Sequence, residues 1–257
     1  MGAYVMPHAK NGTLWIHYEE LGGERDLPPL VLVFGFGMSL RDWVDLGYVA
    51  PLQEAFRLIA VEPRGHGASD GSTNADDYHL DLLASDVVAV MDHLAIEKAI
   101  LWGYSLGAKI VLALTRRRPE RLAGLVVGGF ELASEVRIDD DLVVDTLRKG
   151  GAAWRDLWGR MMALPPPMAD RLSHVDTGAL IALREAEGRW ESLAGVPDII
   201  AVPCLLYAGE HCFGRDVVRA AARSIASSRY VERAGLTHFQ VLGESAWICI
   251  EVKRFFA

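Results

Sequence analysis

A serine between two glycines is the pattern in this chain best suited to chemistry. Residues 99–102 form an apolar run that leads into a Gly-x-Ser-x-Gly motif centred on Ser105, and a helix-forming segment follows directly. This strand–turn–helix context is that of a nucleophile elbow, a strained turn that presents a serine at the top of a parallel sheet. Gly103 and Gly107 suit the turn because side chains there would crowd the neighbouring strand and helix. We predict that Ser105 is a nucleophile, and a purely structural turn is the alternative.

A histidine near the end of the chain is our candidate for the base that such a serine needs. Serine is a poor nucleophile at neutral pH and requires a base within hydrogen-bond reach. His238 lies in a loop-like segment after the last expected strand, on the edge where a parallel sheet presents its sites. It also follows the serine in the chain order of enzymes with this elbow. His66, in a glycine-rich turn, is interpreted as structural.

The elements that position these residues are short apolar runs alternating with helical segments. The expected strands lie at 13–21, 30–34, 57–61, 99–102, 122–127, 204–208 and 228–231. Wholly apolar runs of this length are typical of strands buried on both faces. Residues 80–94 carry apolar side chains at helical spacing, and a closing helix is expected at 246–256. The pattern predicts an α/β fold with a mostly parallel, doubly wound sheet.

One segment, residues 134–197, breaks the alternation. It contains no convincing strand, only helical stretches at 141–149, 152–162 and 177–187. We predict that this segment, which we call the cap, is a helical insertion over the C-terminal edge of the sheet. The rest of the core would then comprise residues 1–133 and 198–257.

Four aromatic residues are candidates for the wall of a substrate pocket. Trp102 and Tyr104 precede the serine, and Trp154 and Trp158 lie on the cap. For the two cap residues, the alternative is that they form the core of the insertion itself.

Composition excludes several classes of function. The chain has 257 residues, of which 51% are hydrophobic, and a net charge of −8, so we expect a small-molecule substrate and no nucleic-acid partner. Three cysteines without metal-ligand spacing indicate free thiols in a reducing compartment. Neither a leader pattern nor a membrane-length apolar run is found, so a cytoplasmic protein is expected, with no membrane partner. We expect no metal and no organic cofactor. A homodimer is possible, because an apolar cap helix suits a substrate pocket or a dimer face equally well.

Several motifs occur together in an order that resembles the α/β-hydrolase family over nearly the whole chain. They run Phe34-Gly-Phe-Gly, then Glu62-Pro-Arg-Gly-His-Gly-Ala-Ser, then the elbow at Ser105, then Gly-Glu-His-Cys212, then Gly-Leu-Thr-His238. The resemblance is to bacterial esterase and lactonase-type members with a small helical cap. It implies a Ser-His-acid triad that cleaves an ester or lactone of a small apolar molecule through an acyl-enzyme.

The resemblance also implies an oxyanion hole. In this architecture the donors are the backbone N–H groups of Leu106, after the nucleophile, and of Phe36, in the loop after an early strand. Family members usually have histidine where this chain has Phe34. The histidine shapes the loop and carries no proton, so the change affects the path of the loop and removes no donor.

The third member of the triad departs from the family pattern. The family usually places an aspartate at the position of Cys212, and a thiol is mostly neutral at neutral pH. Glu131, directly after the expected strand 122–127, is our leading candidate for the acid that orients His238. Glu210 or Asp216 is a second possibility, and a site without any acid is a third. A catalytic thiol at Cys212 is disfavoured because Ser105 already occupies the elbow.

Two other functions remain open at this level. The same fold supports carbon–carbon cleavage and lyase chemistry, so resemblance does not choose the reaction. A ligand-binding member without catalysis is the other alternative, supported by the unusual residues Phe34 and Cys212 at motif positions.

Overall fold

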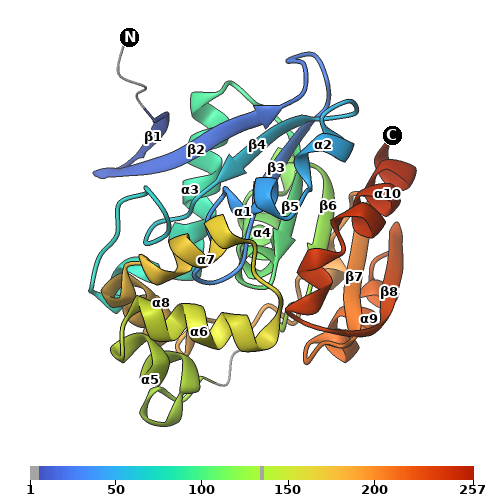
Figure 1. Cartoon of the computed structure of the whole chain (residues 1–257). Helices are drawn as coiled ribbons and strands as arrows, with labels where there is room; N and C mark the ends of the chain where they lie inside the picture. The colour runs from blue at the N-terminus through green and yellow to red at the C-terminus, as the bar shows by residue number, and fades with distance from the viewer. Residues whose placement is uncertain (1–5, 134–135) are drawn as a thin grey trace.

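A central sheet of eight strands organises the computed structural model, which describes residues 6–133 and 136–257 (Figure 1). The strands are β1 (His8–Asn11), β2 (Leu14–Gly22), β3 (Pro29–Val33), β4 (Arg57–Val61), β5 (Ala99–Tyr104), β6 (Leu122–Gly128), β7 (Cys204–His211) and β8 (Ser228–Thr237). Their order in the sheet is β1-β2-β4-β3-β5-β6-β7-β8. β1 pairs with β2, and β2 with β4, in antiparallel orientation. The other six strands, β4, β3, β5, β6, β7 and β8 in sheet order, are parallel to one another.

Helices cover both faces of this sheet, so the predicted mostly parallel, doubly wound α/β fold is confirmed. The helices are α1 (Asp42–Asp45), α2 (Val49–Leu52), α3 (Leu80–His93), α4 (Leu106–Arg117), α5 (Leu142–Arg148), α6 (Gly151–Met161), α7 (Pro166–Ser173), α8 (Thr177–Glu187), α9 (Arg215–Ser224) and α10 (Ser245–Phe256). α3 packs against α4, and α2 packs against α10 (Figure 1). Every residue of β5 is buried, as expected for a central strand with helices on both sides.

Five of these elements, β1, α1, α2, α7 and α9, were not predicted from the sequence. β1 pairs with β2 through a tight turn in which Gly12 has φ +61°, and the Asn-Gly pair at 11–12 is a known hairpin signal. α7 begins at Pro166. Proline is tolerated in the first turn of a helix because the N–H it lacks would have no partner inside the helix.

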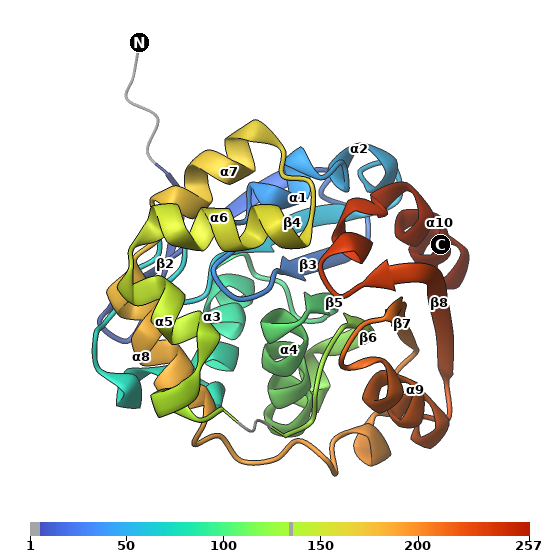
Figure 2. The same ribbon diagram turned by 60° about the horizontal axis from the view of Figure 1, so that its bottom comes forward.

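The cap consists of α5 to α8, and no strand occurs in its described residues, 136–197. Figures 1 and 2 show the four helices gathered on the side of the molecule away from β8. Residues 134 and 135, which include the predicted start of the cap, lie outside the described residues. None of the described helices is both long enough and apolar enough to cross a membrane.

A buried ion pair joins the cap to the helix that follows the elbow. Lys109 of α4 places its Nζ 2.7 Å from Oε1 of Glu187 of α8, and both side chains are buried. Arg184 also pairs with Glu187. Burial alone would raise the pKa of Glu187, but the charges of Lys109 and Arg184 outweigh it and hold that pKa below its usual value. Glu187 is therefore ionised and fastens the cap to α4.

Glu187→Gln should destabilise the protein by about 3 to 5 kcal/mol, because it leaves the Lys109 charge buried without its carboxylate partner. The free energy of unfolding in urea measures this loss. Glu185→Gln, on the same helix, is the matched control and should change stability by less than about 0.5 kcal/mol. Equal losses of stability in the two variants would contradict the conclusion that the Lys109–Glu187 ion pair fastens the cap to α4.

Candidate active site

Ser105 lies at the tip of a strained turn between β5 and α4. Its backbone has φ +56° and ψ −117°, a region that non-glycine residues rarely adopt. The Ser105 N–H donates to the carbonyl oxygen of Gly128 at 2.9 Å. A Cβ on Gly103 would lie 2.3 Å from the Gly107 oxygen, and one on Gly107 would lie 2.0 Å from the Val33 oxygen. Both glycines are therefore required for the close packing that holds the turn.

His238 follows β8 and faces this serine. Its Nε2 is 3.1 Å from Oγ of Ser105, so the structure brings together the two residues predicted as nucleophile and base. The Tyr104 hydroxyl donates to the His238 carbonyl oxygen, which fixes the backbone on which the imidazole is mounted. The geometry is that of a serine poised to transfer its proton to an imidazole.

The side chain that faces Nδ1 of His238 carries a thiol. Cys212 follows β7, and its Sγ is 3.3 Å from Nδ1 of His238. Burial raises the pKa of Cys212 to about 11, and the negative charge of Glu131 contributes to the same shift. The thiol is therefore neutral at physiological pH. It can accept a hydrogen bond from Nδ1, but it supplies no charge to stabilise an imidazolium.

The structure does not bring any of the predicted acids to His238. Glu131 is part of the wall of a surface cavity with Val217 of α9, and within the described residues no hydrogen bond joins it to His238. Glu210 accepts the Gly235 N–H at 2.7 Å, and Asp216 pairs with Arg215. The physical reason is that Cys212 already occupies the position that faces Nδ1.

Aromatic rings enclose the His238 imidazole. Phe213 stacks on it with ring centroids 4.2 Å apart and an interplanar angle of 27°, and the rings of Tyr104 and Phe239 lie at 5.0 and 5.1 Å. His238 is only 4% exposed as a result. This burial lowers its pKa to about 3, with a smaller contribution from the positive charge of Lys109. The imidazole is therefore neutral, the form that a general base requires.

Phe213 is a positioning residue that the sequence analysis missed. It is 63% exposed, which is unusual for a phenylalanine, and its inner face covers the imidazole of His238. No local sequence pattern identifies this role, because the stacking depends on how the turn after β7 meets the loop after β8.

The predicted oxyanion donors flank the serine. A Cβ on Gly35 would lie 3.3 Å from the Ser105 Cβ, so the loop that carries Phe36 passes directly beside the nucleophile. Leu106 is the first residue of α4. In residues 6–133 and 136–257, neither the Phe36 nor the Leu106 backbone N–H has a hydrogen-bond partner, so both donors are available to a ligand.

The unusual Phe34 is accommodated by stacking. Its ring lies parallel to that of Trp43, with centroids 3.6 Å apart and an interplanar angle of 4°. His66 supports the same loop, because its Nε2 accepts the Gly37 N–H at 3.1 Å. Burial lowers the pKa of His66, which keeps that nitrogen an acceptor. The interpretation of His66 as structural agrees with this contact.

The four predicted pocket aromatics divide into two pairs. Trp102 and Tyr104 are fully buried, with the Trp102 indole N–H donating to Tyr207 at 3.0 Å. They belong to the core, which corrects the prediction, because their strand β5 is covered on both faces. Trp154 lies 5.8 Å from the Phe36 ring, and Trp158 lies 5.1 Å from the Phe239 ring. These two cap residues therefore cover the loops that carry the oxyanion donor and His238. Each is also only 3% exposed and belongs to the buried apolar core, in agreement with the alternative that they are core residues.

Comparison with known proteins identifies the family. Residues 28–172 match the alpha/beta hydrolase fold family, and the chain belongs to it. The structure is similar to that of an enol-lactonase from Burkholderia xenovorans LB400, with a TM-score of 0.85 and 25% sequence identity over 97% of this chain and 99% of that one. Esterase structures are also among its structural neighbours.

Curated relatives match over part of their length. A 3-oxoadipate enol-lactonase 2 from Acinetobacter baylyi is 35% identical over 105 residues, which cover 41% of this chain and 38% of that protein. A dihydrolipoyllysine-residue acetyltransferase component of an acetoin cleaving system, from Pseudomonas putida, is 40% identical over 117 residues, 46% of this chain and 30% of that protein. The matches thus span only about a third of these relatives.

Phe213→Ala should shift the acid limb of the pH profile of kcat/KM to higher pH. Burial lowers the His238 pKa, so exposing the ring to water raises that pKa, and the basic form is then lost earlier as the pH falls. Hydrolysis of p-nitrophenyl acetate across the acid range measures the shift. Phe213→Leu keeps the ring covered and should move the limb less. An unchanged profile in Phe213→Ala would show that Phe213 does not shield His238.

Proposed function

We propose that this protein is a serine hydrolase that cleaves an ester or lactone of a small, apolar molecule. The observation that carries the proposal is the 3.1 Å contact between Ser105 Oγ and His238 Nε2 at a strained elbow. The Phe36 and Leu106 N–H groups beside it, which have no hydrogen-bond partner among the described residues, supply the donors that an oxyanion needs. The enol-lactonase likeness in sequence and structure supports this class of substrate.

The reaction proceeds through an acyl-enzyme. Ser105 Oγ attacks the substrate carbonyl while its proton passes to Nε2 of His238, and the two backbone N–H groups hold the resulting oxyanion. His238 then gives the proton to the leaving oxygen. Water, deprotonated by His238, attacks the acyl group. The bond to Ser105 Oγ then breaks, His238 returns the proton to Oγ, and the acid is released. Every step uses groups of this chain, so the proposed reaction needs no metal or organic cofactor.

The cap supplies the apolar surroundings for the substrate. Trp154 and Trp158 are each 3% exposed and lie over the two loops of the site. Their indole N–H groups have no hydrogen-bond partner in the described part of the chain. Large apolar faces with two unpaired donors suit a small apolar substrate that carries an acceptor, such as a lactone.

Cys212 limits the rate of this reaction. A carboxylate behind the imidazole stabilises the imidazolium that forms as serine loses its proton, whereas the neutral thiol of Cys212 does so weakly. The His238 ring is instead oriented by packing and by a hydrogen bond to sulfur. We therefore propose a slow hydrolase with a Ser-His-Cys arrangement.

A fluorophosphonate probe should label the wild-type protein once, and the label should be absent in Ser105→Ala. The probe reacts only with an activated serine, and intact mass spectrometry counts the adducts. Ser72→Ala, at a surface turn, is the control for non-specific labelling and should retain the adduct. Wild-type protein that remains unlabelled would contradict the proposed hydrolase activity. It would favour a ligand-binding member of the family, an alternative that the thiol at Cys212 also supports.

Cys212→Asp should raise kcat/KM on a small ester by about tenfold or more. The new carboxylate would accept the Nδ1–H of His238 and stabilise its charged form, recovering part of the roughly ten-thousandfold that loss of a triad acid costs. Steady-state hydrolysis of p-nitrophenyl acetate provides the measurement.

The matched control for this substitution is Glu131→Gln, which should leave the rate within about a factor of two because, in the described residues, no hydrogen bond joins Glu131 to His238. A rate in Cys212→Asp no higher than that of the wild type, in a protein that still unfolds cooperatively, would contradict the role assigned to the thiol.

A further inference from the structure

The cap contacts the loop that carries one oxyanion donor, both at the middle of the loop and at its end. This loop, which we call the oxyanion loop, comprises residues 34–40. At its middle, a Cβ on Gly37 would lie 2.9 Å from Nε1 of Trp154, on α6. At its end, Arg171 of α7 reaches α1, the helix that follows the loop. α6 packs against α7, and Figures 1 and 2 both show α7 beside α1. Two helices of the cap therefore hold the oxyanion loop against the core.

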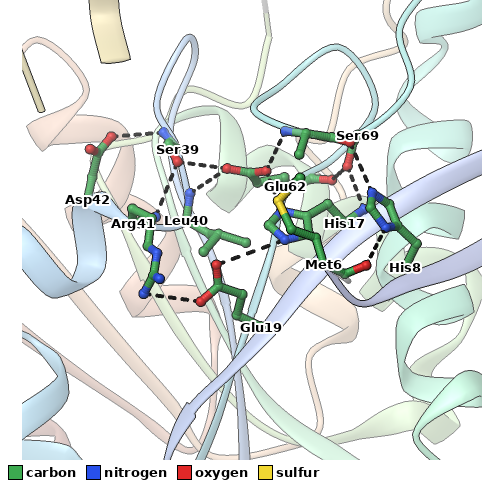
Figure 3. Close-up of polar contacts among 11 residues, drawn as sticks. Met6, His8, His17, Glu19, Ser39, Leu40, Arg41, Asp42, Glu62 and Ser69 are labelled. Atoms are coloured by element: carbon green, nitrogen blue, oxygen red, sulfur yellow. Dashed lines mark hydrogen bonds and ion pairs between the residues drawn. The ribbon is translucent and has the colours of Figure 1, made fainter. Parts of the chain in front are cut away.

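A single buried carboxylate joins the cap to this loop. Asp42 is 1% exposed, and its Oδ2 accepts the Ser39 N–H at 2.8 Å (Figure 3). Its other oxygen, Oδ1, accepts from Nη2 of Arg171 at 2.6 Å and from Nε at 3.2 Å. Arg171 also pairs with Asp45 of α1. Asp42 therefore connects a backbone N–H of the oxyanion loop to a cation of the cap.

A second carboxylate fixes the same end of the loop from the core side. Glu62 accepts the Ser39 hydroxyl at 2.7 Å and the Leu40 N–H at 3.0 Å. It also contacts Nδ1 of His17 and accepts the Ala68 N–H, each at 2.7 Å. Figure 3 shows Ser39 between the two carboxylates. The end of the oxyanion loop thus has one anchor inside the core and one that is paired to the cap.

The Asp42 carboxylate depends on the guanidinium group of Arg171. Burial raises the pKa of Asp42 to about 6, although the hydrogen bonds from Arg171 and Ser39 oppose this shift. Asp42 is therefore ionised at pH 8, as a buried charge paired to the cap. A buried charge that loses its partner is strongly destabilised, so without Arg171 the carboxylate would take up a proton or turn toward water. Either change weakens its bond to the Ser39 N–H, because an ionised acceptor makes the stronger hydrogen bond.

We propose that Arg171 is a positioning residue for the proposed reaction. It holds the Asp42 carboxylate against Ser39 and so fixes the end of the oxyanion loop. The fixed loop in turn places the Phe36 N–H beside Ser105. A displacement of about 1 Å can lower a rate about a hundredfold, so an anchor of this loop matters for catalysis. The position of the cap and the geometry of the oxyanion hole are then set together. This inference rests on the proposed function, because it takes the Phe36 N–H as an oxyanion donor.

Steady-state hydrolysis of p-nitrophenyl acetate by the full chain at pH 8 tests this role. Arg171→Gln should lower kcat about tenfold or more and change KM by less than about twofold, because the oxyanion forms only in the transition state. Arg155→Gln is the matched control. It also removes a guanidinium group from the cap, but one whose exposed ion pair is with the neighbouring Asp156, and it should leave kcat unchanged. An unchanged kcat in Arg171→Gln would overturn the proposal. A loss confined to KM would also overturn it, because Arg171 would then act on substrate binding alone.

A double-mutant cycle tests whether Arg171 acts through Asp42. Asp42→Asn removes the charge that pairs with Arg171, and it should also lower kcat. The double variant, with Asp42→Asn and Arg171→Gln together, should be no slower than the slower of the two single variants, because both remove the same contact. Losses that multiply in the double variant would overturn the proposed connection.

Hydrogen exchange of the Ser39 N–H, followed by NMR, is a readout that needs no turnover. This N–H should exchange about tenfold faster or more in Arg171→Gln than in the wild type, and at an unchanged rate in Arg155→Gln. Unchanged exchange in Arg171→Gln would overturn the proposal even if that variant loses activity. Wild-type protein without a fluorophosphonate label would overturn the proposed function, and the catalytic role of Arg171 with it. A labelled wild type with unchanged exchange in Arg171→Gln would overturn this inference alone.

Discussion

The close packing of the elbow against the neighbouring strand is the constraint on which the rest of the site depends. Ser105 is held at φ +56°, a conformation that costs about 1 to 3 kcal/mol and persists only where the surroundings enforce it. Here Gly107 lies directly against the Val33 carbonyl, and the Ser105 N–H is bonded to Gly128. Three adjacent strands, β3, β5 and β6, thus fix the Ser105 side chain. The same turn places the Leu106 N–H at the start of α4, where it has no hydrogen-bond partner in the described part of the chain.

The imidazole is held mainly by apolar packing. Phe213 and Tyr104 lie close to the His238 ring, and Cys212 occupies the position behind it. Packing of this kind fixes orientation and lowers the His238 pKa, but it does not stabilise the charge that appears when serine gives up its proton. The site therefore combines well-ordered geometry with a weak base. A carboxylate would supply orientation and charge stabilisation together.

The sequence predicted the features that depend on local spacing. It did not predict side-chain positions that depend on packing between distant segments. The elbow, the bounds of β4 and α8, and the pairing of Ser105 with His238 follow from short motifs and their order. Glu131 follows β6 as expected but lines a surface cavity with Val217 and Ala220 of α9. Trp102 and Tyr104 are core residues since both faces of β5 are covered. Phe213 has no signal in the sequence.

The state of the His238 ring tests this account most directly. Nitrogen-15 NMR of the imidazole, assigned with a His238→Gln variant and followed as the pH is lowered, reports which nitrogen carries the proton and where the ring titrates. We predict a neutral ring with its proton on Nδ1, titrating far below the ordinary histidine pKa of about 6.5, toward the value of about 3 that burial produces. A ring that titrates near 6.5, or that carries its proton on Nε2 at neutral pH, would contradict it.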